Sequence, residues 1–338
     1  IDQYGADTLR FFLTTNSAPG MDLRYIPEKL EASWNFINKI WNSARFVLMN
    51  IDEDLEYKDL KFDHLNLCDK WILNRLNNVI EEVDANMDKF EFVNVGSELY
   101  KFIWDDFCSW YIELTKVHLN SDNEVEKQAS AHTLVYVLNA IVRMLHPFMP
   151  FVTEEIYQAI PHLEESICIS KYPTVNPDFN DENINRQFTY LMDIVKGVRE
   201  IRANYTIKNA IEVEYSIETK DENLQALLDQ CVPYLKKLCN ATCVGYNQKA
   251  SKDIATAMIQ GGNTLIVELG AYVDKEAEKQ KLQAELQKLE GEIKRCTNML
   301  SNEKFVSKAP QAKVDSERQK LEDYTSKYNA VKEKLAAM

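Results

Sequence analysis

The apolar positions in the first half of the chain repeat with the period of a helix. One stripe within residues 27–50 recurs at spacings of three and four residues and comprises Trp34, Ile37, Trp41, Ala44 and Leu48. This spacing predicts an amphipathic helix with the tryptophans on its apolar face. Three similar patterns predict helices over residues 67–87, 93–119 and 124–145. Because the connections between them are short and polar, we expect antiparallel neighbours and a helical bundle over residues 26–175.

The pattern becomes mixed after residue 175. A helix at 186–203 and another at 223–238 flank an alternating strand at 211–217. Short strands follow, and a Gly261-Gly262-Asn263 turn between residues 255–259 and 264–269 is typical of a hairpin. Residues 176–271 are therefore predicted to form a small α/β unit.

The last 67 residues, 272–338, carry heptad repeats. The first stripe is Leu282, Leu286, Leu289, Ile293, Cys296 and Leu300, and the second is Val314, Leu321, Tyr328 and Leu335. Because a break at residues 301–310 separates them, they predict an antiparallel coiled-coil hairpin. Phe305 and Val306 beside the turn are expected to hold its two helices together. The fold class is therefore mainly α: a helix bundle, a small α/β unit and a coiled-coil arm.

The charge of the chain is unevenly distributed. The net charge of −14 argues against a nonspecific binder of polyanions, but residues 274–338 carry 14 basic and 12 acidic side chains. The middle of the arm concentrates the cations, which are Lys294, Arg295, Lys304, Lys308, Lys313, Arg318 and Lys320. Because a cationic tip on an acidic protein is costly unless it meets an anion, this cluster predicts contact with nucleic acid. The alternative is that these charges serve solubility only.

A second candidate surface lies on the helix over residues 27–50. Its members share one sector, about 120° from the centre of the predicted tryptophan face at 100° per residue, and are Asn38, Asn42, Arg45, Phe46 and Met49. Amides, guanidinium groups and rings of this kind recognise unpaired RNA bases. The alternative is that the amides are solvated and that Phe46 packs against a neighbouring helix.

The helix over residues 93–119 carries a dense aromatic stripe. Its members are Tyr100, Trp104, Phe107, Trp110 and Tyr111. Most of this stripe is expected in the core, because each helix of a bundle buries one face. Lys101 and Lys116 on the same helix are interpreted as ordinary solvated charges, although an RNA backbone is an alternative partner.

Several classes of protein are excluded by composition and motifs. A hydrophobic content of 45% excludes global disorder, and the lack of a long apolar run or signal peptide argues for a cytoplasmic protein without a membrane span. Seven scattered cysteines indicate reduced thiols, and neither Cys239-x3-Cys243 nor the five histidines have the spacing of a zinc site, so no metal is expected. The sequence shows no phosphate loop or hydrolase motif. Since the chain starts at Ile1, it is expected to be part of a longer protein.

Several segments together resemble a known family. They are DQYGADTLRFFL (2–13), NKIWNSARF (38–46), DKWILNRLN (69–77), FCSWYIELTK (107–116), LHPFMPFVTEEIYQ (145–158) and NEKFVSKAP (302–310). The chain resembles the C-terminal part of bacterial-type valyl-tRNA synthetases, which are class I aminoacyl-tRNA synthetases. The first of these segments is similar to the stretch that follows the KMSKS loop in this class. The resemblance covers nearly the whole chain.

The resemblance implies a specific function. The parent enzyme would join valine to its tRNA with ATP and Mg²⁺, whereas this fragment lacks the HIGH and KMSKS motifs, needs no cofactor of its own and is expected to be inactive alone. Residues 1–25 would be the junction after the catalytic domain. The bundle would bind the anticodon of tRNA(Val), with Phe46 as a stacking residue beside Arg45 and Asn42. The arm would contact the corner where the D and T loops meet.

Two alternatives stay open at this stage. The bundle motifs are shared with isoleucyl-tRNA synthetases, and only the arm and the lack of a terminal zinc segment favour the valyl family. A coiled-coil interaction scaffold without an RNA partner is the other alternative. That scaffold would self-associate through the arm, whereas a tRNA-binding fragment is expected to be a monomer whose two arm helices cover each other's apolar seams.

Overall fold

Two compact units make up the described part of the chain. The computed structural model describes residues 1–16, 20, 22, 25–248, 253–272, 275–301 and 311–337. The first unit comprises Ile1–Arg199, Glu212–Gln248 and Ala257–Leu265, and the second comprises Glu200–Ile211, Lys249–Thr256 and Ile266–Met338. The first therefore holds the helical bundle with much of the α/β segment, and the second holds the arm. The four-part division expected from the sequence stays a prediction.

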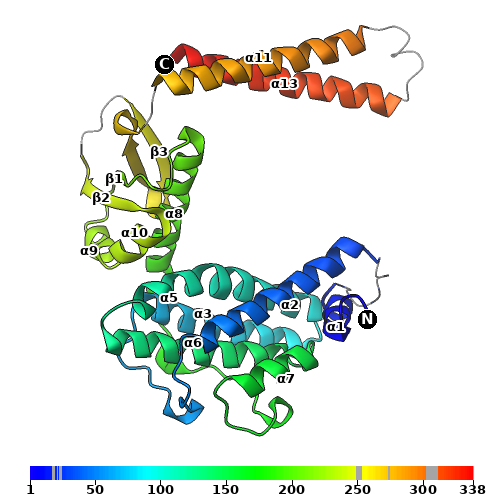
Figure 1. Cartoon of the computed structure of the whole chain (residues 1–338), viewed down its shortest axis with the longest axis vertical. Helices are drawn as coiled ribbons and strands as arrows, with labels where there is room; N and C mark the ends of the chain where they lie inside the picture. The colour runs from blue at the N-terminus through cyan, green and yellow to red at the C-terminus, as the bar shows by residue number, and fades with distance from the viewer. Residues whose placement is uncertain are drawn as a thin grey trace. The chain divides into compact units, whose positions relative to one another are not determined.

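The bundle is all helical, as Figure 1 shows in blue to green. Its α-helices are α1(Ala6–Thr15), α2(Pro27–Leu48), α3(Leu67–Asp88), α4(Phe92–Lys101), α5(Ile112–Leu119), α6(Glu124–Leu145) and α7(Pro150–Ala159). The four helices predicted here are confirmed to within a few residues. No helix among the described residues is long and apolar enough to cross a membrane.

Local sequence determines where these helices begin. Asn66 and Asp69 form a capping box at α3: the Asn66 side chain accepts the Asp69 N–H at 3.0 Å, and Asp69 accepts the Asn66 N–H at 3.4 Å. Asn123 caps α6 by accepting the N–H of Val125. Pro27 and Pro150 stand in the first turns of α2 and α7, where a missing N–H costs nothing.

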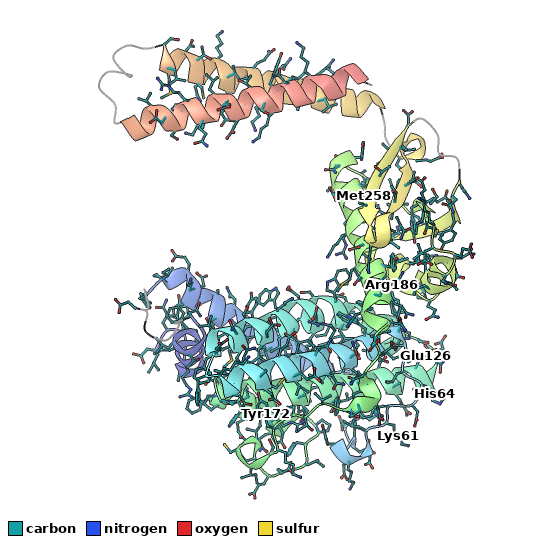
Figure 2. All side chains as sticks on the ribbon, turned by 180° about the vertical axis from the view of Figure 1, so that it is seen from behind. Lys61, His64, Glu126, Tyr172, Arg186 and Met258 are labelled. Carbon is teal, nitrogen blue, oxygen red and sulfur yellow. The ribbon has the colours of Figure 1, made fainter. Side chains whose placement is uncertain are left out.

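The connections of the bundle are fixed by long-range hydrogen bonds. Asp7 of α1 accepts the N–H groups of Phe151 and Val152 at 3.3 and 2.7 Å, at the positive end of α7. Lys61, labelled in Figure 2, donates its backbone N–H to His132 Nδ1 at 2.9 Å and so ties the α2–α3 connection to α6. The bonds of Asp7 thus attach α1 to α7, and the bond of Lys61 attaches the α2–α3 connection to α6.

The buried face of α2 includes Ile37 and Ala44 of the predicted stripe, but not Leu48 or the two tryptophans. The residues facing the core are Leu30, Ser33, Phe36, Ile37, Ile40, Ser43, Ala44 and Val47. Trp34 and Trp41 remain 38% and 42% exposed. The chain contains two overlapping stripes with the same spacing, and the aliphatic one packs into the core because its side chains fill the narrow space between helices. Both tryptophans therefore point outward.

The helix expected over residues 93–119 contains a π-helical segment, η2(Phe102–Tyr111), between α4 and α5. Its wider turn buries Phe102, Phe107 and Tyr111, which are five and four residues apart. Tyr100 is exposed instead, and Trp104 is only partly covered. Phe107 and Tyr111 of the predicted stripe are buried, and Trp110, like Trp104, is half-buried. The prediction that most of the aromatic stripe is core is therefore wrong.

A buried carboxylate joins three helices in the centre of the bundle. Asp69 of α3 accepts hydrogen bonds from the hydroxyl groups of Tyr111, at 2.7 Å, and Ser130 of α6, at 3.2 Å. Burial raises the pKa of Asp69 to about 6, although these hydrogen bonds act in the opposite direction. The charge of this side chain is therefore coupled to the stability of the core.

The α/β segment is built around α8(Ile184–Tyr205) and a four-stranded sheet (Figure 1). Its remaining elements are β1(Val213–Glu218), α9(Leu224–Asp229), α10(Val232–Cys239), β2(Ala241–Tyr246), β3(Ile254–Ile259) and β4(Asn263–Glu268). The strand order is β2-β1-β4-β3, with β1 parallel to β2 across the helical crossover. The single helix predicted at 223–238 is divided, with Pro233 in the first turn of α10. The predicted hairpin is confirmed, with Gly261 and Gly262 at positive φ.

The arm consists of α11(Lys275–Leu300) and α13(Gln311–Ala337), which pack against each other. Cys296 and Val314 are fully buried between them, and Leu289 is also buried. The two heptad stripes therefore meet within one chain, as predicted. Residues 302–310 lie outside the described residues, and with them lie the predicted staple of Phe305 and Val306 and the cations Lys304 and Lys308.

Candidate nucleic-acid interface

The outward face of α2 collects the residues that the sequence singled out in the bundle. Asn42 and Arg45 are exposed, Asn38 and Phe46 are half-buried, and Met49 at the end of the helix is exposed. Since all five project from one continuous helix, their spacing is set by backbone hydrogen bonds. Asn50 strengthens the end of this helix by donating its side-chain N–H to the carbonyl of Phe46 at 2.7 Å.

The exposed tryptophans extend this face. Trp34, Trp41 and Leu48 are seven residues apart, so they form a second row beside Asn38 and Arg45. Tyr4 packs edge-on against Trp34, with ring centroids 6.4 Å apart, and leaves Trp41 uncovered on the outward side. Sequence reasoning missed this row because it took the tryptophans as the apolar stripe. A second apolar stripe with the same spacing, which contains Phe36, Ile40 and Val47, was the signal that could have identified the buried face.

Two lysines lie over aromatic rings at the edge of this face. Lys116 Nζ, from α5, is 5.6 Å from the centre of the Phe46 ring. Lys39 Nζ is 5.3 Å from the centre of Trp104, whose ring stacks on Tyr100 at 5.5 Å. These are cation–π distances. Lys116 therefore belongs to the candidate interface, although its sequence context favoured an ordinary solvated charge.

The face combines the groups that bind unpaired nucleotides. Rings offer stacking surfaces, amides offer donors and acceptors for base edges, and Lys116 with Arg45 offers positive charge for phosphate. Glu113 moderates that charge, because its carboxylate lies 2.6 Å from Lys116 Nζ. This pair is partly exposed, so it contributes little to stability and can exchange for another anion.

The cations of the arm are divided between paired and open positions. Arg295 contacts Glu292 at 2.8 Å and Glu317 at 3.5 Å, and Lys320 contacts Glu317 at 2.7 Å. Arg318 lies 3.7 Å from Asp315, and Lys294 is exposed. Lys304 and Lys308 lie outside the described residues, as does the side chain of Lys313. The charge count of the sequence therefore overstates the free positive charge along the described helices.

The buried carboxylate of Glu317 explains why Arg295 and Lys320 are paired. Its carboxylate is only 6% exposed and lies within the seam beside the Cys296 thiol, so it requires compensation by the two neighbouring cations. Arg295 and Lys320 thus stabilise the arm as well as carrying charge. The hairpin positions them on the same side of the seam as Glu317.

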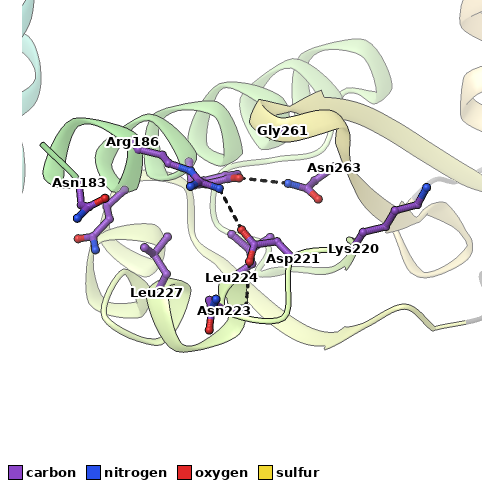
Figure 3. A pocket seen from close by; sticks show the side chains of 11 residues that line it. Asn183, Arg186, Lys220, Asp221, Asn223, Leu224, Leu227, Gly261 and Asn263 are labelled. Atoms are coloured by element: carbon purple, nitrogen blue, oxygen red, sulfur yellow. Dashed lines mark hydrogen bonds and ion pairs between the residues drawn. The ribbon is translucent and has the colours of Figure 1, made fainter.

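A separate cavity of about 580 Å³ lies in the α/β segment. Figure 3 shows Arg186 of α8 directed at Asp221, with 3.3 Å between Nη2 and Oδ2. The Asn263 side chain donates a hydrogen bond to the Tyr190 hydroxyl at 3.4 Å. The charge of Arg186 is therefore compensated within the cavity by Asp221. The cavity also lies on different elements from the α2 face.

Two family models match the chain. The anticodon-binding domain of tRNA ligases matches residues 69–217, and the valyl tRNA synthetase tRNA binding arm matches residues 274–338. Together they cover more than half of the chain. Helix α2 precedes the first match and lies within the region aligned to whole-chain relatives.

The relatives include several bacterial valine–tRNA ligases. The enzyme of Enterococcus faecalis is 43% identical over 340 residues, and those of Bacillus cereus and Staphylococcus aureus are each 44% identical over 339 residues. These alignments cover 99–100% of this chain, which spans 38% of the length of each relative. A LeuRS–tRNA–LeuAMS complex from Agrobacterium radiobacter aligns with 53% of this chain and 20% of its own chain, at a TM-score of 0.41 and 17% identity, and is too distant to inform the site.

These matches distinguish the valyl family from the isoleucyl alternative, because the arm model and the relatives carry the valyl name. Along the chain, the match to the anticodon-binding domain precedes the match to the tRNA binding arm. Over its whole length the chain is therefore similar to the C-terminal part of the valyl-tRNA synthetases.

Proposed function

We propose that this chain recognises tRNA(Val) for a valine–tRNA ligase and positions it for aminoacylation by a catalytic domain outside this sequence. The observation that carries the proposal is the outward face of α2, where exposed rings, amides and cations lie together on a rigid helix. A structural helix of a bundle has no need to expose two tryptophans. The family matches are named for anticodon binding over residues 69–217 and for tRNA binding over residues 274–338.

The α2 face would bind the anticodon. Bases that leave their stack in the anticodon loop can stack on Phe46, while Asn42 and Asn38 present amides to base edges. Lys116 and Arg45 would lie close to the adjoining phosphates, and Trp41 would extend the stacking surface. Each contact is made by a side chain that the core does not fully cover.

The arm would contact the outer corner of the tRNA, where the D and T loops meet. Its exposed ion pairs can open at small cost, because surface pairs contribute only about 0–1 kcal/mol. Phosphate groups could therefore replace Asp315 at Arg318 and compete for the other cations. Pairing of α11 with α13 inside one chain supports a monomer.

The work of this chain would be positional. Holding the tRNA at the anticodon and at the corner fixes where its acceptor end lies, which converts binding energy into orientation. ATP, Mg²⁺ and valine would bind to the catalytic domain, so this chain would need no cofactor to position the tRNA. The cytoplasm, where translation takes place, would be its location.

Binding of two tRNA transcripts that differ only in the anticodon tests the proposal. We expect the chain to bind the transcript with a valine anticodon more tightly. Nucleotides of the anticodon loop and of the D/T corner should be protected in footprints. Equal affinity for both transcripts together with an unprotected anticodon would reject the proposal.

A further inference from the structure

Three side chains with different metal-binding atoms meet at the C-terminal end of α6. His146 is the C-cap residue of α6, Glu154 lies on α7, and Cys168 lies in the short helix η3(Ile167–Ile169). Their ligand atoms all lie within 4.8 Å of one another. His146 and Glu154 are half-buried, whereas the free thiol of Cys168 is exposed. The cluster is remote in sequence from the α2 face and from the arm.

The hydrogen bonds of His146 fix which ring nitrogen can bind a metal. Thr153 Oγ1 lies 2.7 Å from the carbonyl of Met149 and donates its only hydrogen there. His146 Nδ1, 2.8 Å from the same hydroxyl oxygen, must therefore be the N–H donor. The lone pair of Nε2 is left facing Cys168 Sγ at 3.3 Å. A histidine that donates one N–H to a neighbour and offers the other nitrogen is the usual arrangement of a metal ligand.

The other two ligands are also held in place. Glu154 accepts hydrogen bonds from Gln158 at 2.8 Å and from Ser166 at 3.0 Å. Ser166 in turn accepts the backbone N–H of Cys168 at 3.2 Å. These bonds orient the carboxylate and the η3 turn toward His146 and leave further lone pairs on the carboxylate oxygens.

Geometry and chemistry indicate the class of ion. Metal–ligand lengths of about 2.3 Å for sulfur and 2.0 Å for nitrogen place these two atoms about 3.5 Å apart in a tetrahedral zinc site. The observed 3.3 Å is close to this edge. Sulfur, imidazole and carboxylate together suit Zn²⁺ or Co²⁺ rather than Mg²⁺ or Ca²⁺, which prefer oxygen alone.

We propose that His146, Glu154 and Cys168 form a three-ligand site for a divalent transition metal ion such as Zn²⁺, with water as the fourth ligand. The ion would join the end of α6, the helix α7 and the η3 turn. Spacings of 8 and 14 residues match no zinc motif, which is why the sequence predicted no metal. The proposal does not depend on the proposed tRNA function.

Cobalt binding provides the test. The chain, freed of metal with a chelator, is titrated with Co²⁺ and followed by the thiolate-to-cobalt charge-transfer band. We expect one equivalent to bind and Zn²⁺ to displace it, and we expect Zn²⁺ to raise the melting temperature of the chain. Cys168→Ser should abolish the band, and His146→Asn, which can keep the hydrogen bond to Thr153, should do the same.

Two further variants separate a built site from adventitious thiol binding. Cys243→Ser removes a half-exposed thiol elsewhere and should leave the titration unchanged. Thr153→Val keeps the ligands but frees the His146 ring, and should weaken Co²⁺ binding by about 10- to 100-fold. A missing band in the unmodified chain, or an equal band in Cys168→Ser, overturns the proposal and leaves an ordinary hydrogen bond between thiol and imidazole.

Discussion

Replacing Phe46 by alanine tests the α2 face most directly. The ring is half-buried beside Lys116, so it has a packed part and a part available to a base. Loss of one base–aromatic stack costs about 1–3 kcal/mol, which corresponds to about a 5- to 150-fold weaker tRNA affinity. Because the lost contact is with a base, the affinity difference between valine and other anticodons should shrink with it.

Lys116→Met separates the ring from the cation above it. Methionine keeps an apolar stem over Phe46 but removes the charge, so an exposed cation–π contact of about 0.5–1 kcal/mol is lost. If the ammonium group also meets a phosphate, the slope of log affinity against log salt should decrease by about 0.7–0.9. Phe46→Ala should leave that slope unchanged, because it removes no charge.

The assay is fluorescence anisotropy with labelled transcripts at several salt concentrations. Phe151→Ala is the matched control, because this ring is 67% exposed and belongs to α7 rather than α2. Circular dichroism and thermal unfolding establish that each variant is folded. A folded Phe46→Ala variant that still distinguishes anticodons as well as the parent chain would refute the assignment of Phe46.

Three further predictions concern the arm, catalysis and the buried carboxylate. A triple charge reversal near the turn of the arm should weaken tRNA binding and flatten the dependence of affinity on salt. A control triple reversal away from the turn should have a smaller effect on both. Equal effects of the two variants would refute a contact at the tip. The test residues are Lys304, Lys308 and Arg318, and the controls are Lys288, Lys327 and Lys332. The isolated chain should form no valyl-adenylate, so valine-dependent exchange of pyrophosphate into ATP above background would contradict the positional role. Between about pH 4 and pH 6 the folded chain retains a proton on Asp69 that the unfolded chain releases. The free energy of unfolding, measured with urea, should therefore fall by up to about 3 kcal/mol as the pH rises through this range. Asp69→Asn has no proton to release and should lack this part of the fall.

The parts of the fold that the sequence predicts best depend on local rules. The proline at the start of α2 and the heptad stripes of the arm need no knowledge of distant residues. Cys296 and Val314 meet in the seam because a seven-residue repeat allows only one face to be shared. The long helices of the bundle are likewise predicted by a local rule, the spacing of their apolar residues by three and four positions.

Sequence reasoning missed the features that depend on tertiary packing, where two sets of residues on one helix have the same spacing and either could be buried. In α2 the row of Trp34 and Trp41 and the row of Ile40 and Val47 are equally periodic, and packing against other helices decides between them. The π-helical turn of η2 changes which aromatic rings are buried without changing the sequence pattern. The closeness of Lys116 to Phe46 likewise requires the placement of α5 beside α2.

In α2 and in the arm helices, the residues that stabilise the fold and the residues proposed to bind RNA lie on different sides of the same helix. In α2 the aliphatic row packs in the core, so the outward rings and amides add little to folding. In the arm the heptad residues form the seam, while Arg318 and Lys294 stand outside it. Arg295 and Lys320 are exceptions, because they compensate the buried charge of Glu317. Substitution of the outward groups should therefore change affinity for RNA with small effects on unfolding, whereas loss of Arg295 should change both.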